Sequence, residues 1–126
     1  MTLSRRIAMI SEHANPLALL GSEDAGGQNV YVYEVSLGLA RLGYHVDVFC
    51  RRDRSDVPEV VPLGDRARVV HVDAGPPEFV RKDDLWAMMP AFARGCRRYM
   101  QRQEHPYDLL HSNFWMSGWV ACELGA

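Results

Sequence analysis

The chain has 126 residues, of which 48% are hydrophobic and 24% are charged, and its net charge at pH 7 is −2. This length and composition are typical of one soluble globular domain that buries a core without disulfides or metals. The balanced charge gives no indication of a nucleic-acid partner or a membrane surface, since both attract strongly basic chains. We also expect no targeting segment or membrane span, because the apolar run after the basic start, Met1–Arg6, is too short.

The three cysteines, Cys50, Cys96 and Cys122, lie far apart and have no CxxC spacing. An odd number argues against a disulfide framework, and the spacing argues against a zinc site. We therefore expect buried thiols in a cytoplasmic protein, and we assign no metal and no cofactor to the chain.

The first strand and the loop after it form the opening unit. Arg5–Ser11 is predicted to be a buried parallel strand, because Ile7, Ala8, Met9 and Ile10 are apolar in succession. The following segment, Glu12–Gly27, is predicted to be a long loop, and such loops inside compact domains are often functional.

The glycine pair Gly26-Gly27 stands where this loop meets a predicted helix. The first turn of a helix has N–H groups without intrahelical partners and carries partial positive charge. Glycines let the backbone come close to a ligand, so this position suits a phosphate. The alternative is an ordinary turn, because the pattern is neither GxGxxG nor Walker A.

The helix itself is predicted over Gln28–Leu42. Its apolar positions recur at spacings of three and four, which places them on one face: Val32, Val35, Leu39 and Leu42. Gly43 is expected to end the helix in a left-handed conformation.

Two further strands are predicted over Tyr44–Cys50 and Ala67–Val72, with a charged, proline-containing loop, Arg51–Arg66, between them. That loop carries a basic cluster that could meet a phosphate, but interleaved aspartates favour a solvated loop: Arg51, Arg52 and Arg54, with Asp53 and Asp56.

A lone lysine follows the third strand. Gly75 and two prolines end that strand, and Lys82 is the single lysine of the sequence. Two interpretations remain open, a solvated surface charge and a phosphate ligand, and the local sequence favours the surface charge. Asp83 or Asp84 could cap the next helix.

That helix is predicted over Leu85–Gln103, with a kink or a later start at Pro90. Its apolar positions have helical spacing: Leu85, Met88, Met89, Phe92, Cys96 and Tyr99. Four arginines share the polar side, and we favour a solvated face over an anion site: Arg94, Arg97, Arg98 and Arg102.

A fourth strand, Tyr107–His111, precedes the polar and aromatic loop His111–Trp115, and a last helix begins at Met116. For His111, a structural role and a site role are equally supported. For Phe114 and Trp115 the alternative to a site role is core packing, which we favour for Trp115.

The order of strands and helices predicts an α/β fold, a Rossmann-like parallel sheet with flanking helices. In such sheets ligands bind beyond the carboxyl ends of the strands. Three segments are expected at that edge: the Gly26-Gly27 loop, Gly75–Lys82 and His111–Trp115.

Three runs, in this order, resemble the retaining GT-B glycosyltransferases of family 4. They are DAGGQNVYVYEVSLGLARLGYHVDVFCRR, the stretch from Gly75-Pro76 to Lys82, and HPYDLLHSNFWMSG. The first and last runs resemble a group that includes sucrose-phosphate synthases, sucrose synthases and the enzyme that glycosylates inositol phosphate in mycothiol synthesis. The middle run is most similar to the mycothiol branch of the family.

The resemblance implies that residues 1–126 form the N-terminal, acceptor-side domain of such an enzyme, without its C-terminal donor domain. The intact protein would transfer a hexose, glucose or N-acetylglucosamine, from a nucleotide sugar such as UDP-glucose to a sugar or polyol acceptor. Gly26 and Gly27 would meet the donor diphosphate, and four residues would bind the acceptor: Asn29, Lys82, Asn113 and Phe114. No catalytic residue and no metal ligand is implied within this chain.

The sequence departs from the family pattern at two of these positions. Phe114 replaces a tyrosine and has no hydroxyl donor for a phosphate. Asn113 replaces a histidine of many relatives, and it can bond a sugar hydroxyl but cannot carry a proton at neutral pH.

A second hypothesis is a stand-alone Rossmann-like module that binds a phosphorylated ligand or a partner without catalysis. A nicotinamide dehydrogenase is a weaker third, because GxGxxG is missing after the first strand. For the glycosyltransferase domain and for the stand-alone module alike, we expect the missing domain or another chain to cover the open side of the sheet.

Overall fold

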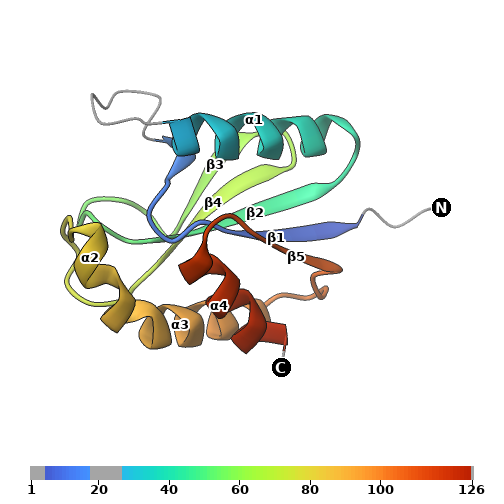
Figure 1. Cartoon of the computed structure of the whole chain (residues 1–126). Coiled ribbons are helices and arrows are strands. Elements are labelled where there is room, and N and C mark those ends of the chain that lie inside the picture. Colours follow the sequence, from blue (N-terminus) through green and yellow to red (C-terminus); the bar gives the residue numbers. More distant parts are fainter. Residues whose placement is uncertain (1–4, 18–26, 126) are drawn as a thin grey trace.

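A five-stranded sheet forms the centre of the molecule, with the strand order β3-β4-β2-β1-β5 (Figure 1). The structure is a computed structural model that describes residues 5–17 and 27–125. The strands are β1 (Arg6–Ile10), β2 (His45–Arg51), β3 (Val60–Gly64), β4 (Ala67–Val72) and β5 (Leu109–Ser112). β1 pairs in parallel with β2 and β5, and β2 pairs in parallel with β4. The predicted Rossmann-like sheet is therefore confirmed for these four strands.

The fifth strand, β3, is a correction to the sequence analysis. It pairs antiparallel with β4 inside the segment that was predicted to be a charged loop. Pro62 made that segment look irregular, but a proline is tolerated in an edge strand, where one side of the backbone has no partner. The register shifts between Pro62 and Gly64, as expected for an irregular edge.

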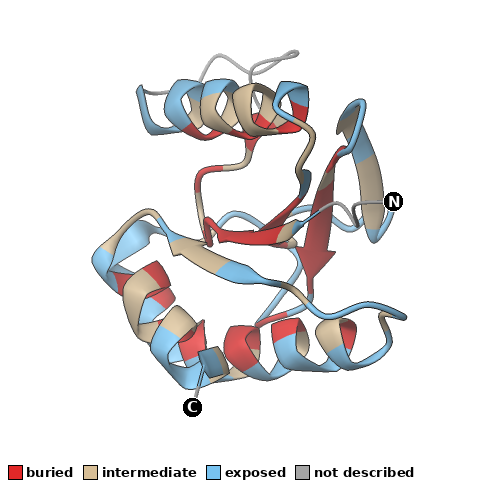
Figure 2. Cartoon of the chain, turned by 90° about the vertical axis from the view of Figure 1, so that its right-hand side faces the viewer, coloured by how far each residue is buried: buried red, intermediate tan, exposed pale blue. Residues whose placement is uncertain are grey.

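One helix covers one face of the sheet, and the remaining helices cover the other face (Figure 1). The single helix is α1 (Gly27–Arg41), and the others are α2 (Lys82–Leu85), the short 3-10 helix η2 (Trp86–Met88), α3 (Met89–Gln101) and α4 (Trp115–Gly125). Figure 2 shows that the buried residues lie on the strands and on the helix faces that are turned toward them. Among the described residues, no helix is long and apolar enough to cross a membrane.

The end of α1 follows the sequence prediction with one exception. Gly43 has φ +100° and its N–H donates to the carbonyl of Ala40 at 3.0 Å, so it ends the helix as expected. Val32 is buried and Val35 and Leu39 pack against the core. Leu42 is 76% exposed, so its predicted place on the apolar face is wrong. The helix ends at Arg41, and the chain turns Leu42 into solvent.

The helical region after β4 is divided, as Pro90 suggested. α3 begins at Met89 with the proline in its first turn, where a missing N–H has no helical partner to lose. The predicted cap by Asp83 or Asp84 is wrong. Arg81 holds the N-cap position of α2 without a side-chain hydrogen bond, and both aspartates lie in the first turn.

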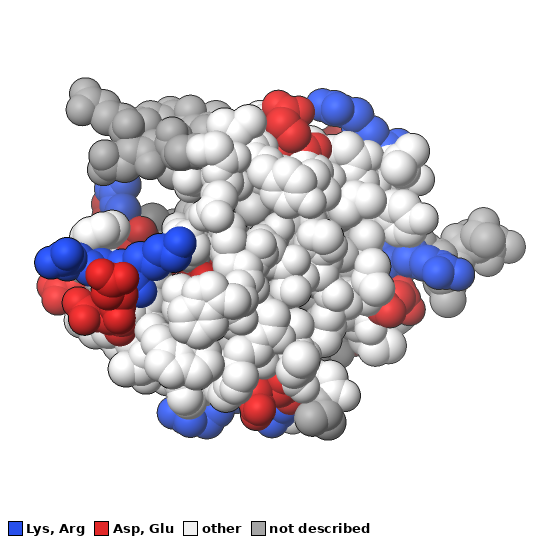
Figure 3. Space-filling model, in the orientation of Figure 1, with Lys and Arg blue, Asp and Glu red and all other residues white. Residues whose placement is uncertain are grey.

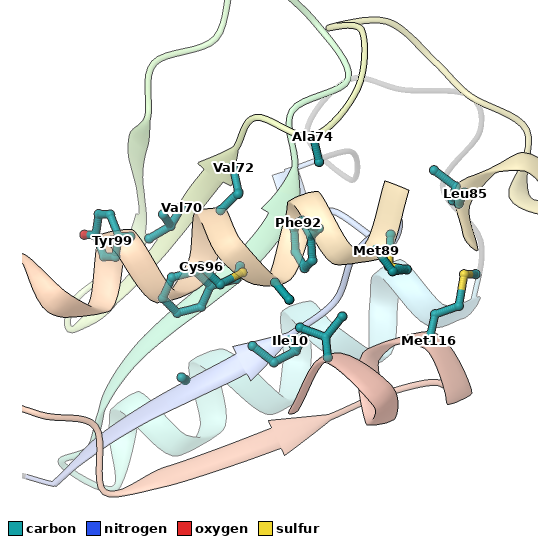
Figure 4. Close-up of a cluster of buried hydrophobic side chains, with 14 residues drawn as sticks. Ile10, Val70, Val72, Ala74, Leu85, Met89, Phe92, Cys96, Tyr99 and Met116 are labelled. Carbon is teal, nitrogen blue, oxygen red and sulfur yellow. The ribbon is translucent and has the colours of Figure 1, made fainter. Parts of the chain in front are cut away.

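Two apolar clusters join the helices to the sheet. The larger one lies between the sheet and α3 and α4, and Figure 4 shows its side chains converging between these elements. α3 approaches β4 closely at Gly95, where an added Cβ would lie 2.3 Å from Cγ1 of Val72. Cys50 and Cys96 are buried as predicted, and burial raises the pKa of both thiols, whereas Cys122 is exposed.

The buried carboxylate of Asp47 links three segments near the amino ends of the parallel strands. It accepts hydrogen bonds from Nε and Nη2 of Arg68, both at 2.9 Å, from Nη2 of Arg6 at 3.2 Å, and from the hydroxyl of Tyr107. These partners belong to β4, β1 and the segment before β5. Burial and the bond to Asp47 raise the pKa of Tyr107, so its hydroxyl stays a donor.

Candidate functional site

The segment that follows β1 contacts both the first turn of α1 and the segment that follows β5, at the carboxyl edge of the parallel strands. Chain segments at this edge are where α/β sheets bind ligands. The structure therefore brings the described end of the Gly26-Gly27 loop and the His111–Trp115 segment together, and the Gly75–Lys82 segment borders the same location.

His13 lies at the centre of this location. Its Nδ1 is 3.0 Å from Oε1 of Glu12, and its Nε2 is 3.1 Å from Oε1 of Gln28 in the first turn of α1. Its ring lies 4.6 Å from the ring of Phe114, which follows β5. His13 is not among the site residues predicted from the sequence. Its place directly after an apolar strand, at the edge where ligands bind, is the signal that could have found it.

The side chain of Glu12 is completely buried, with 0% of its surface exposed. It accepts a hydrogen bond from the hydroxyl of Ser117 in α4, and the backbone carbonyl of Glu12 accepts the N–H of Arg51 at 3.0 Å. Since a buried carboxylate requires hydrogen-bonding partners, Glu12 and His13 hold each other in one orientation.

Asn29 is fixed by the loop after β1. Its Nδ2 donates to the carbonyl of Asn15 at 2.9 Å. The Asn15 side chain accepts the N–H of Leu17 and reaches Nε2 of His71 at 2.9 Å, while Nδ1 of His71 is 2.9 Å from the carbonyl of Pro58. These partners suit a neutral imidazole that donates from Nδ1 and accepts at Nε2. Burial lowers the pKa of His71, in agreement with this neutral form.

Asn113 has one bonded and one unbonded amide atom. Its Nδ2 donates to the carbonyl of Ile10 at 2.7 Å. Its Oδ1 is buried and has no hydrogen-bond partner in the part of the chain that the structure describes. An unsatisfied buried carbonyl oxygen is costly, so Oδ1 is suited to accept a hydrogen bond from a ligand. His111 lies inside β5, half-buried, rather than in the loop after it.

The two aromatic residues after β5 have different environments. Phe114 is half-buried against His13 and the core below α1. Trp115 is 64% exposed, so its predicted core packing is wrong. As the first residue of α4, it contacts Trp86 with ring centroids 5.0 Å apart, and Trp86 contacts Trp119 at 5.3 Å.

The predicted phosphate site is described only in part. Gly26 lies outside the described residues. Gly27 is the first residue of α1 and is exposed, and a Cβ added there would meet no atom of the described residues within 4 Å. Within the part of the chain that the structure describes, Gly27 thus leaves room for a ligand at the same edge as His13.

Lys82 lies at the beginning of α2, with its side chain exposed. It does not line the small hollow of about 50 Å³ that separates Glu12 and His13 from Val80 and Leu85. The structure thus brings the segment around Lys82 to the border of the His13 cluster but shows no contact between Lys82 and that cluster.

The three arginines at the end of β2 and just after it are not equivalent. Arg54 pairs with Asp56 at 3.0 Å on the surface, as expected for a solvated loop. Arg51 is buried, so the solvated-loop interpretation is wrong for this residue. Arg52 pairs with Asp73 at 2.7 Å.

The polar side of α3 carries mixed charge. Arg98 and Arg102 line a hollow of about 310 Å³ together with Glu59 and Asp73, and Arg102 bonds Glu59 at 3.0 and 3.1 Å. This arrangement fits a solvated face better than an anion site.

In Figure 3 the charged residues gather at the margins of the visible face, and its centre is uncharged. Among the described residues, no group of three or more His, Cys, Asp or Glu side chains could hold a metal ion.

Comparison with known proteins gives a consistent result. The model of the glycosyl transferase 4-like domain matches residues 26–126. The D-inositol 3-phosphate glycosyltransferase of Kineococcus radiotolerans is 49% identical over 117 residues, covering 92% of this chain and 27% of that protein. The protein of the same name from Xylanimonas cellulosilytica is 44% identical over 126 residues, covering 97% of this chain and 30% of that protein.

A solved structure is also similar. Sucrose-phosphate synthase from Thermosynechococcus elongatus superposes with a TM-score of 0.86 at 36% identity, covering 96% of this chain and 30% of that chain. The present chain therefore spans less than a third of the length of these relatives, and its fold matches the N-terminal part of GT-B enzymes. Because the family model matches most of the sequence, the chain belongs to the family of glycosyl transferase 4-like domains.

Proposed function

We propose that this chain is the acceptor-side part of a retaining glycosyltransferase. The intact protein transfers a hexose, glucose or N-acetylglucosamine, from a UDP-sugar to a hydroxyl of a small sugar or polyol, including a phosphorylated one. The observation that supports this most directly is the meeting of His13, Asn29, Asn113 and Phe114 beside the amino end of α1. The names of the relatives support an acceptor of this class, since one is a D-inositol 3-phosphate glycosyltransferase and the other a sucrose-phosphate synthase.

The amino end of α1 is proposed to meet the donor diphosphate through Gly26 and Gly27. Backbone N–H groups and the helix dipole stabilise the negative charge that develops on the leaving diphosphate. Gly27 suits this role because it is exposed and leaves room for a ligand to approach its amide.

The acceptor is proposed to lie over His13 and Asn113. Oδ1 of Asn113 accepts a hydrogen bond from a ligand hydroxyl, and Asn29 stands on the α1 side of the same site. Lys82 supplies a positive charge for a phosphorylated acceptor from the beginning of α2. Phe114 offers a ring face instead of a hydroxyl donor, so it shapes the site without bonding the phosphate.

The rest of the reaction is proposed to depend on a C-terminal donor domain, as in GT-B enzymes. We assign no catalytic side chain to residues 1–126, and we expect this chain to be inactive alone. We propose a cytoplasmic location, where nucleotide sugars and phosphorylated sugars are available.

The test uses the full-length protein with UDP-glucose or UDP-N-acetylglucosamine and with inositol phosphate or fructose 6-phosphate. UDP release and product mass are measured, and at least one pair is expected to react. Asn113→Ala should raise the KM for the acceptor by about tenfold, the effect of losing one hydrogen bond to a ligand. Gln101→Ala, at the exposed end of α3, is the matched control and should change nothing. No transfer with any pair would contradict the proposal.

A stand-alone binding module is the second candidate, in which the exposed tryptophans Trp86 and Trp115 would contact a different protein rather than a donor domain. Binding of inositol phosphate or UDP by calorimetry, without any transfer by the full-length protein, would support this candidate over the first.

A further inference from the structure

Arg51 is a buried cation that the proposed function does not use. It is the last residue of β2, and only 4% of its surface is exposed. Its Nη1 donates to the carbonyls of Ala74 at 3.0 Å and Pro76 at 2.8 Å, and its Nη2 donates to the carbonyl of Glu78. A weaker bond reaches the carbonyl of Arg52 at 3.2 Å.

The guanidinium thus binds the loop between β4 and α2, residues 73–81, at three successive places. Within the described residues, all its hydrogen bonds go to backbone carbonyls and none to a carboxylate. A buried charge needs full hydrogen-bonding compensation, and charge-assisted bonds are the stronger ones. The loop carbonyls therefore hold Arg51 in place, and Arg51 in turn holds the loop.

The other anchors of the loop lie near its two ends: Arg52 pairs with Asp73 at 2.7 Å, and Ala74 and Val80 pack against the larger apolar cluster. The loop contains no helix or strand between Val72 and Lys82, and its one internal backbone bond joins the N–H of Glu78 to the carbonyl of Pro76 at 2.8 Å. Gly75 has φ +72°, and an added Cβ there would lie 2.7 Å from Sδ of Met88. The backbone of the loop therefore packs closely against Met88 on one side and is held by hydrogen bonds from Arg51 on the other.

The loop leads directly to the candidate site. Arg51 and Val80 line the same small hollow as Glu12 and His13, and Lys82 begins α2 two residues after Val80. Any shift of the loop would move Lys82 relative to His13.

We propose that Arg51 is a positioning residue, which fixes the β4–α2 loop so that Lys82 stands at the border of the His13 cluster. It acts through the loop and touches no ligand. The planar fork of arginine can serve several carbonyls at once, which a lysine ammonium cannot do in the same geometry. This inference rests on the proposed function, under which Lys82 meets the acceptor.

The first experiment measures hydrogen exchange of the full-length protein by mass spectrometry. Arg51→Lys should speed exchange in peptides covering residues 73–82 by about tenfold, because local opening becomes easier, and should leave β1 and α1 unchanged. Arg54→Lys is the matched control, since the Arg54 side chain is 68% exposed and, among the described residues, pairs only with Asp56. Unchanged exchange in residues 73–82, or a uniform rise over the whole chain, would overturn the proposal.

A second measurement needs no variant and covers the case in which Arg51→Lys does not fold. In arginine-labelled wild-type protein, NMR should show that the guanidinium protons of Arg51 exchange more slowly with water than those of Arg54. Equal exchange at the two arginines would overturn the proposal.

The third experiment measures steady-state kinetics, because a purely structural role would not change the KM for the acceptor separately from kcat and the KM for the donor. Arg51→Lys should raise the KM for a phosphorylated acceptor by about tenfold, as expected for a displaced charged contact, with kcat and the KM for the donor nearly unchanged. Arg54→Lys should alter none of them. A lower kcat without a change in the acceptor KM would overturn the positioning role. If the wild type transfers no sugar, the proposed function fails, and the exchange experiments alone decide the role of Arg51.

Discussion

At the scale of single residues, the edge of the sheet is defined by side chains that fix one another. His13 is held between Glu12 and Gln28, and Asn29 is held by the backbone of Asn15. Such mutual bonds keep side chains in one orientation before a ligand arrives, which lowers the free energy that binding must spend on ordering. Gly27 differs from these residues, because its contribution is space: an added Cβ would meet no atom of the described residues within 4 Å.

Gly27→Val tests that contribution. The variant should fold normally, because a Cβ there meets no atom within 4 Å. In the full-length protein it should raise the KM for the UDP-sugar by about tenfold or more, since a branched side chain blocks approach to the amide. Gly38→Val is the matched control, because Gly38 lies in the same helix with equally open surroundings. Equal donor kinetics for the two variants would contradict the role of Gly27.

At the scale of elements, two polar clusters hold the strands and loops in register. One joins His71 of β4 to Asn15 and Pro58, and the other joins Asp47 of β2 to its neighbours on both sides. Both are buried, so changes in their charge or composition should appear as changes in stability.

The His71 cluster predicts a pH dependence of stability. Burial lowers the pKa of His71 below its ordinary value of 6.5 in the folded state, so the unfolded chain takes up a proton first as the pH falls. The free energy of unfolding should therefore be unaffected by His71 above about pH 7 and should decrease as the pH falls below about 6.5. Urea denaturation at about pH 7 and pH 5 measures the slope. His71→Gln should reduce the slope, and the exposed His45→Gln should not.

Asp47→Ala should be strongly destabilising. The change leaves Arg6, Arg68 and Tyr107 without their shared acceptor, and breaking a buried charge pair costs about 3–5 kcal/mol. Urea denaturation measures the loss. Asp56→Ala, which removes the exposed partner of Arg54, is the control and should leave the midpoint almost unchanged. Similar midpoints for the two variants would show that the Asp47 cluster does not hold the strands together.

At the scale of the whole molecule, the sheet is covered on both faces but ends in β5 at one edge. Leu109 of β5 is 55% exposed, and Trp86 and Trp115 expose aromatic surface beside α4. Unpaired strand edges and exposed apolar surface promote association.

The 126-residue chain alone should therefore self-associate at micromolar concentration, as measured by size-exclusion chromatography with light scattering. Trp115→Ser should increase the monomer fraction. Leu42→Ser, which removes a 76% exposed side chain at the end of α1, should not. A stable monomer of the unmodified chain would favour a complete stand-alone module instead.

The sequence by itself determined the parallel strands, the main helices and the family, because these depend on local patterns. The apolar run Ile7–Ile10, the spacing of Val32, Val35 and Leu39, and the break at Gly43 are each readable within a few residues. A resemblance of three ordered runs then supplied the family, which the comparisons confirmed.

Only the tertiary structure decided what depends on contacts between distant segments. The pairing of β3 with β4, the burial of Arg51 by carbonyls more than twenty residues away, and the exposure of Trp115 all depend on which elements become neighbours. The same holds for the contact between His13 and Phe114, whose rings lie 4.6 Å apart although the two residues are far apart in the sequence. Local patterns fix which face of an element is apolar, whereas long-range packing fixes which partner that element meets.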